Sequence, residues 1–105
     1  MRQWKKIQEV LRAVIDISSA ISTVMSRLKK LSDGHYVELL TFKKDRSIRI
    51  VKISDGELLV VESGYARERL QVAPDKLKTT LKKLIKKEFP RSNKLHLNFG
   101  EQPDS

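Results

Sequence analysis

The feature that most constrains this fold is a heptad repeat of apolar side chains between Trp4 and Leu31. The repeat is made by Ile7, Val10, Val14, Ile17, Ile21, Val24, Leu28 and Leu31. Apolar residues at this spacing share one face of a helix, so the pattern predicts a continuous helix over residues 1–33. At ~1.5 Å per residue such a helix would be longer than the strands of a small sheet.

The serine pair Ser18-Ser19 is a competing helix boundary inside this segment. Serine side chains compete for backbone hydrogen bonds and can cap a second helix. Because the heptad continues through the pair, one continuous helix is preferred. Gly34 favours the end of the helix, since glycine readily adopts the left-handed conformation that closes many helices.

A long apolar helix face suggests self-association, so we expect a homo-oligomer. The residues predicted for the interface are Ile7, Val10, Val14, Ile17, Ile21 and Val24. β-Branched residues at both repeating positions disfavour a parallel two-stranded coiled coil. The sheet that follows offers the same stripe a second target, and we therefore expect part of it to pack within its own subunit.

Three segments rich in β-branched and aromatic residues follow, at 35–43, 46–53 and 57–63. Tight-turn sequences separate them, which predicts a three-stranded antiparallel meander over residues 35–63. Residues 58–61 are apolar on both faces of their strand, so we expect cover on both faces, from a second helix or a partner subunit. Residues 65–72 are compatible with either a strand or a loop.

Pro74-Asp75 predicts the start of a second helix, because proline and an acidic residue suit the first turn. The helix is expected to end at Phe89-Pro90, and residues 94–99 alternate as a half-exposed last strand. Residues 100–105 are expected to form a frayed tail. The fold class is therefore α+β, a single domain over residues 1–105 of order α-β-β-β-α-β, with helices packed on one antiparallel sheet.

The net charge of +9 is unevenly distributed along the chain. Residues 1–32 hold seven Lys or Arg against two acidic residues, and residues 73–96 hold eight against two. Residues 33–72 are balanced, with seven of each. Such asymmetry favours a polyanionic partner, although Lys-rich surfaces also keep small proteins soluble.

No pattern of residues predicts an enzyme. His35 and His96 belong to no cluster with metal-ligand spacing, and no G-x-S-x-G surrounds any serine. The four glycines are isolated, so neither a P-loop nor a dinucleotide-binding motif is present. We therefore expect a non-enzymatic protein without a cofactor, a bound metal or a small-molecule substrate.

The second helix and the turn after it have the composition of a phosphate-backbone binder with low sequence specificity, for DNA or RNA. The residues predicted to bind nucleic acid are Lys78, Lys82, Lys83, Lys86, Lys87, Arg91, Lys94, Arg49, Lys52 and Tyr65. Tyr65 would stack on a base, or else fold back on the core. The alternative function is a protein–protein adaptor or assembly factor that docks through the N-terminal helix, with the lysines only maintaining solubility.

The chain contains no cysteine, which favours a reducing, cytoplasmic setting. Charged residues interrupt the apolar stretch near the N-terminus, and this pattern argues against both a signal peptide and a membrane span.

Overall fold

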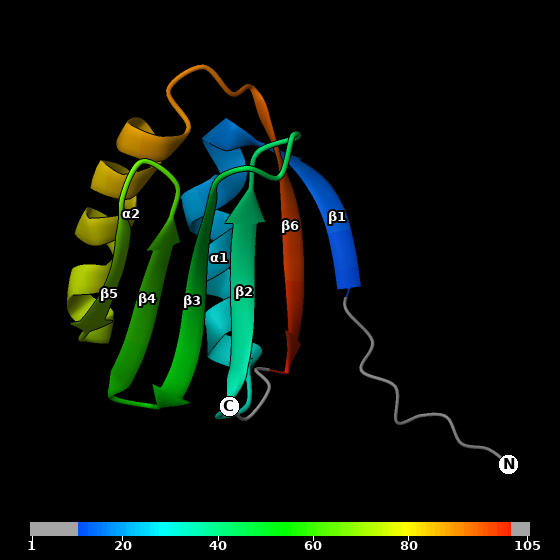
Figure 1. Cartoon of the computed structure of the whole chain (residues 1–105). Coiled ribbons are helices and arrows are strands. Elements are labelled where there is room, and N and C mark those ends of the chain that lie inside the picture. The colour runs from blue at the N-terminus through cyan, green and yellow to red at the C-terminus, as the bar shows by residue number, and fades with distance from the viewer. Residues whose placement is uncertain (1–10, 102–105) are drawn as a thin grey trace, which may run out of the picture.

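A computed structural model describes residues 11–101, which form one six-stranded antiparallel sheet with two α-helices on one face (Figure 1). The strands are β1 (Leu11–Asp16), β2 (His35–Leu40), β3 (Ser47–Ser54), β4 (Glu57–Ser63), β5 (Arg67–Val72) and β6 (Lys94–Glu101). A 3-10 helix η2 (Ile17–Ser19) leads into α1 (Ala20–Lys30), and α2 (Pro74–Glu88) precedes β6. The predicted α+β class with a single antiparallel sheet is confirmed.

The strand order in the sheet is β1-β6-β2-β3-β4-β5. The predicted three-stranded meander has a fourth strand, because residues 67–72 pair with β4 as β5. The last strand of the chain, β6, lies between β1 and β2 and pairs with both. After α2 the chain must therefore cross one end of the sheet to reach β6 (Figure 1).

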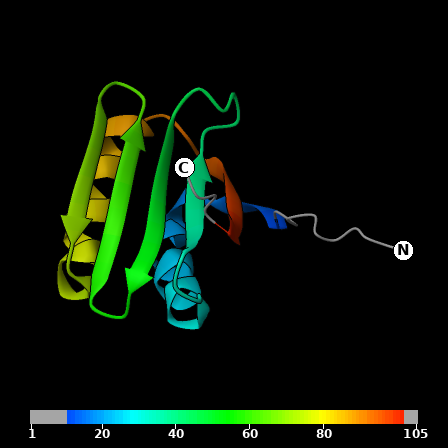
Figure 2. The ribbon, with the colours of Figure 1, turned by 60° about the horizontal axis from the view of Figure 1, so that its bottom comes forward.

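The hydrophobic core lies between the sheet and the two helices, which cover the same face (Figure 2). Side chains alternate along each strand, so every second residue points toward the helices. The buried core residues on β2, β3 and β4 are Val37, Leu39, Ile48, Ile50, Leu58 and Val60. The helices contribute Ala20, Val24, Leu28, Leu77, Leu81 and Leu84.

The opposite face of the sheet carries no helix among residues 11–101. The second helix therefore does not cover this side of β4, where Leu59 and Val61 are half-buried. Tyr36 on this face is buried, and the Arg49 guanidinium lies 3.8 Å above the centre of its ring. Arg49 Nε also donates to Glu38 Oε2 at 3.1 Å, so this side chain links two strands.

The predicted continuous helix over residues 1–33 is wrong for residues 11–19. Residues 11–16 form β1, and α1 begins only at Ala20, with Ser19 as its N-cap. The competing helix boundary at Ser18-Ser19 is therefore the one observed. Val14 and Ile15 are β-branched and suit a strand, and β6 provides a partner with which this segment can hydrogen-bond.

Three of the six residues predicted for an oligomer interface contribute to the core of their own subunit. Val24 is fully buried in the core of its own subunit, and Ile17 and Ile21 pack against that core. Val14 lies on β1 and is 53% exposed. Ile7 and Val10 lie outside the described residues. From residue 17 onward the apolar stripe therefore packs on its own sheet, as expected for part of the stripe.

The second half of the chain follows the predicted order of elements. The helix predicted over 74–89 is observed over Pro74–Glu88. The last strand extends to Glu101, so residues 100 and 101 belong to the sheet instead of the predicted tail. Neither α1 nor α2 is long and apolar enough to span a membrane, and the same is true of every helix within residues 11–101.

Candidate nucleic-acid interface

Three connections that are distant in sequence meet at one end of the sheet, at the top of Figure 1. They are the β2–β3 loop (41–46), the β4–β5 turn (64–66) and the connection from α2 to β6 (89–93). They enclose an open cleft of about 770 Å³, which we name the loop-end cleft. Its lining residues are Thr41, Phe42, Lys43, Asp45, Arg46, Tyr65, Pro90, Arg91, Ser92, Asn93 and Lys94.

The topology of the sheet explains why the connection from α2 contributes to this cleft. Phe89 is buried and anchors the end of α2, while Pro90 prevents the helix from continuing. The backbone N–H of Ser92 then donates to the Phe89 carbonyl at 3.2 Å, which turns the chain toward β6. Arg91 and Lys94 are thereby carried to the end of the sheet where the β2–β3 loop lies.

The loop-end cleft is electropositive. Four cationic side chains line it against one acidic side chain, and the cations are Lys43, Arg46, Arg91 and Lys94. The acidic residue, Asp45, accepts a hydrogen bond of 2.7 Å from the Thr41 hydroxyl, and this bond lowers the pKa of Asp45. Lys94 is also ion-paired with Asp16 across β1 and β6 at 2.5 Å, a contact that is exposed to solvent.

Two exposed aromatic rings also line the cleft. Phe42 stacks on His96 with 4.6 Å between ring centroids and 26° between planes. The Arg46 guanidinium lies 4.2 Å from the centre of the Tyr65 ring, and its Nη1 donates to the Glu88 carbonyl at 3.0 Å. Each ring is therefore held on one side by a second side chain.

A buried carboxylate fixes the turn that carries Tyr65. The backbone N–H of Tyr65 lies 3.0 Å from Oε1 and 3.1 Å from Oε2 of Glu88, a residue that is fully buried at the end of α2. The carboxylate occupies the space beside Gly64, where a larger residue would collide with it. This contact ties the β4–β5 turn to the last turn of α2.

Glu88 has a second buried acid as its neighbour. Burial raises the pKa of Glu62, and a hydrogen bond with Glu88 raises it further, while Lys87 Nζ at 3.0 Å acts in the opposite direction. Burial alone would also raise the pKa of Glu88. The hydrogen bonds that Glu88 accepts from Glu62, Tyr65 and Ala66 outweigh burial and lower it. Within this pair the pKa of Glu62 is therefore the raised one and that of Glu88 the lowered one.

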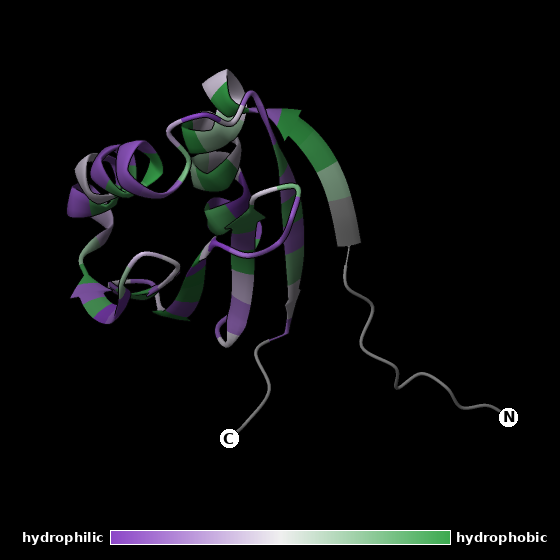
Figure 3. Cartoon of the chain, turned by 45° about the horizontal axis from the view of Figure 1, so that its top comes forward, coloured by the Kyte–Doolittle hydropathy of each residue, from purple (hydrophilic) through white to green (hydrophobic). Residues whose placement is uncertain are grey.

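The lysines of α2 extend the positive charge away from the cleft. Lys78, Lys82, Lys83 and Lys86 are exposed, and Lys87 is half-exposed while it pairs with Glu62. Hydrophilic residues dominate α2 in Figure 3. The helix ends against the turn of Tyr65, so its last lysines lie near the cleft.

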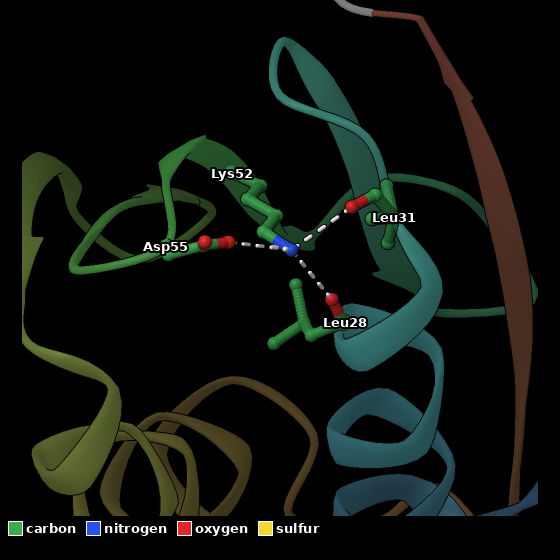
Figure 4. Close-up of polar contacts among 4 residues, drawn as sticks. All are labelled: Leu28, Leu31, Lys52 and Asp55. Carbon is green, nitrogen blue, oxygen red and sulfur yellow. Dashed lines mark hydrogen bonds and ion pairs between the residues drawn. The ribbon is translucent and has the colours of Figure 1, made fainter.

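Lys52 does not belong to this surface. Its side chain is only 13% exposed, and Nζ donates to the carbonyl oxygens of Leu31 at 2.9 Å and Leu28 at 3.3 Å (Figure 4). Asp55 Oδ1 lies 3.5 Å from the same nitrogen. Lys52 therefore satisfies the C-terminal carbonyls of α1 and is not placed to contact a phosphate.

Sequence reasoning identified only part of the cleft. The structure brings together Tyr65, Arg91 and Lys94 from the predicted set, whereas Arg49 lies among Glu38 and Tyr36 on the sheet face. Phe42, Lys43 and Arg46 were not predicted. The signal for them is an aromatic residue directly before a basic turn, at residues 42–46.

No protein family, curated protein or solved structure matches this chain. Within residues 11–101 no three His, Asp or Glu side chains are grouped so that they could hold a metal ion. Function is therefore inferred from the chemistry of the loop-end cleft and α2.

Proposed function

We propose that this chain is a non-enzymatic nucleic-acid-binding protein that contacts the phosphate backbone with low sequence specificity. The loop-end cleft and the C-terminal half of α2 form the binding surface, and a cytoplasmic location is part of the proposal. The observation that carries it is the meeting of four cationic side chains from the β2–β3 loop, the connection after α2 and the start of β6, against one acidic side chain.

The cations of the cleft are suited to phosphate groups. Lys43 and Arg91 are exposed side chains on different loops that line the same cleft, and both can pair with phosphate groups. The exposed lysines of α2 add attraction without sequence choice, because lysine acts as a point charge. Low specificity is the expected consequence.

Fluorescence polarisation with a labelled oligonucleotide tests the proposal. Binding should be strong at ~50 mM salt and fall steeply by ~200 mM, because each neutralised phosphate releases counterions. Failure to bind any nucleic acid at the lower salt concentration contradicts the proposal and leaves the protein–protein adaptor as the favoured function. A stoichiometric partner recovered after nuclease treatment would support that adaptor.

Charge-reversal variants locate the surface. Lys43→Glu with Arg91→Glu should weaken binding and reduce the salt slope by about one for each lost phosphate contact. Lys29→Glu with Lys30→Glu is the matched control, because it changes the net charge equally at the far end of α1. Equal losses in the two double variants would show that only total charge matters.

The contribution of α2 needs a separate variant. Replacing Lys82, Lys83 and Lys86 with Glu should weaken binding further when combined with the cleft variant. Unchanged binding in the triple variant would restrict the surface to the cleft.

A further inference from the structure

We infer that the loop-end cleft selects unpaired nucleic acid by stacking bases on Phe42 and Tyr65. This inference rests on the proposed function, and it adds the class of strand that the site prefers. It depends on a separate observation, the placement of two aromatic rings.

Both rings are exposed although they belong to a folded domain. Phe42 is 55% exposed and Tyr65 is 66% exposed, and both line the loop-end cleft. Rings that stabilise a core are buried, as Phe89 is. Two large apolar surfaces left in water within one concave site are typical of a ligand contact.

The two rings are also held in position before any ligand binds. His96 stacks on Phe42 from β6, and Arg46 lies over Tyr65. The backbone of Tyr65 is fixed by the carboxylate of Glu88. A ring that is already ordered loses little conformational entropy on binding, so more of the stacking energy appears as affinity.

The cations of the cleft cannot distinguish single strands from duplexes, because both present phosphates. The rings can distinguish them. In a duplex the base faces are covered by neighbouring bases, and exposing one face requires unstacking. In a single strand the bases are free to stack on aromatic side chains while Lys43 and Arg91 contact the flanking phosphates.

Three oligonucleotides of equal length test the inference with the unmodified protein: a single strand, its duplex, and a single strand with abasic sites. The abasic strand keeps the phosphates but has no bases to stack. We expect the single strand to bind about 5- to 150-fold more tightly than the abasic strand for each base that stacks. The duplex should bind more weakly than the single strand.

Two alanine variants assign the effect to the rings. Phe42→Ala and Tyr65→Ala should each weaken binding of the intact single strand and leave binding of the abasic strand unchanged. Tyr65→Phe keeps the ring and should retain binding. Ile53→Ala is the matched control, because it removes another exposed apolar side chain at the opposite end of β3.

The outcomes separate the two proposals. Equal, salt-dependent affinity for all three oligonucleotides would overturn base stacking and leave phosphate binding intact. Loss of binding to all three would overturn both. The comparison of intact and abasic strands uses the unmodified protein. It therefore tests base stacking even if an alanine variant is poorly folded.

Discussion

Gly64 lies so close to Glu88 that a Cβ atom built on it would overlap Oε1 and lie 2.8 Å from Cδ. The buried carboxylate occupies this space because it accepts the backbone N–H of Tyr65. A glycine is therefore needed here for room and not for an unusual backbone angle, since positive φ among the described glycines occurs at Gly34. Through this contact the end of α2 determines the shape of the turn that carries Tyr65.

Replacing Gly64 with Ala should destabilise the protein by about 1–3 kcal/mol, because the added methyl group must displace the buried carboxylate or the backbone. Urea unfolding measures the change in the free energy of unfolding. Gly56→Ala is the matched control, since a Cβ at Gly56 meets nothing within 4 Å. Equal effects of the two substitutions would contradict the close contact with Glu88.

Glu62 should make stability fall as the pH rises. A carboxyl group whose pKa is raised in the folded state contributes stability that is complete below its unfolded pKa, about 4.3, and is lost as the pH passes the raised value. Glu62→Gln keeps the shape and cannot ionise. We expect the variant to remove this loss, measured as a flatter dependence of the free energy of unfolding on pH. Parallel curves for the two proteins would contradict a raised pKa of Glu62.

Glu88 should act in the opposite direction. Its lowered pKa contributes stability that is present above the unfolded pKa of about 4.3 and is lost as the pH falls through the lowered value. Glu88→Gln removes the charge that accepts the N–H groups of Tyr65 and Ala66, so it should cost about 1–3 kcal/mol at neutral pH. The loss of stability as the pH falls should also be smaller in this variant. Thermal unfolding between acid and neutral pH measures both effects, and an unchanged stability at neutral pH would contradict the role of the carboxylate.

The N-terminal segment shows why a clear periodicity can predict the wrong structure. Val14, Ile17, Ile21 and Val24 fit a heptad, but Ala13, Ile15 and Ile17 also fit the alternation of a strand. The choice depends on β6, which lies almost eighty residues later and pairs with β1 from Asp16↔Lys94 to Leu11↔Phe99. The sequence of the N-terminal segment contains no information about that partner strand. The heptad was therefore the stronger local pattern, and it predicted a helix. The segments with a single interpretation, such as β4 and α2, were predicted closely.

The candidate site was predicted in part for the same reason. Arg91 and Lys94 belong to a basic run that is visible in the sequence. Lys43 and Arg46 belong to a stretch whose overall charge is balanced, and only the fold brings them beside that run. Lys52 was predicted to bind nucleic acid because it is cationic, but its position on β3 turns it toward α1. Charge counted along a chain does not indicate which cations are used to stabilise the fold.

Lys52 yields a final prediction about α1. Its ammonium group donates to the carbonyl oxygens of Leu28 and Leu31 at the C-terminus of α1, and the Leu28 carbonyl also accepts the backbone N–H of Leu31. Lys52→Met preserves the length of the side chain but removes both hydrogen bonds from Lys52, including the one to the Leu31 carbonyl. We expect a loss of about 2 kcal/mol in the free energy of unfolding.

Asp55→Asn is the control, because Asp55 is 99% exposed and its ion pair with Lys52 should contribute less than about 0.5 kcal/mol. If the two variants lost equal stability, the ion pair rather than the capping of α1 would account for the position of Lys52. Nucleic-acid binding should be the same in both variants as in the unmodified protein, since neither residue lines the loop-end cleft.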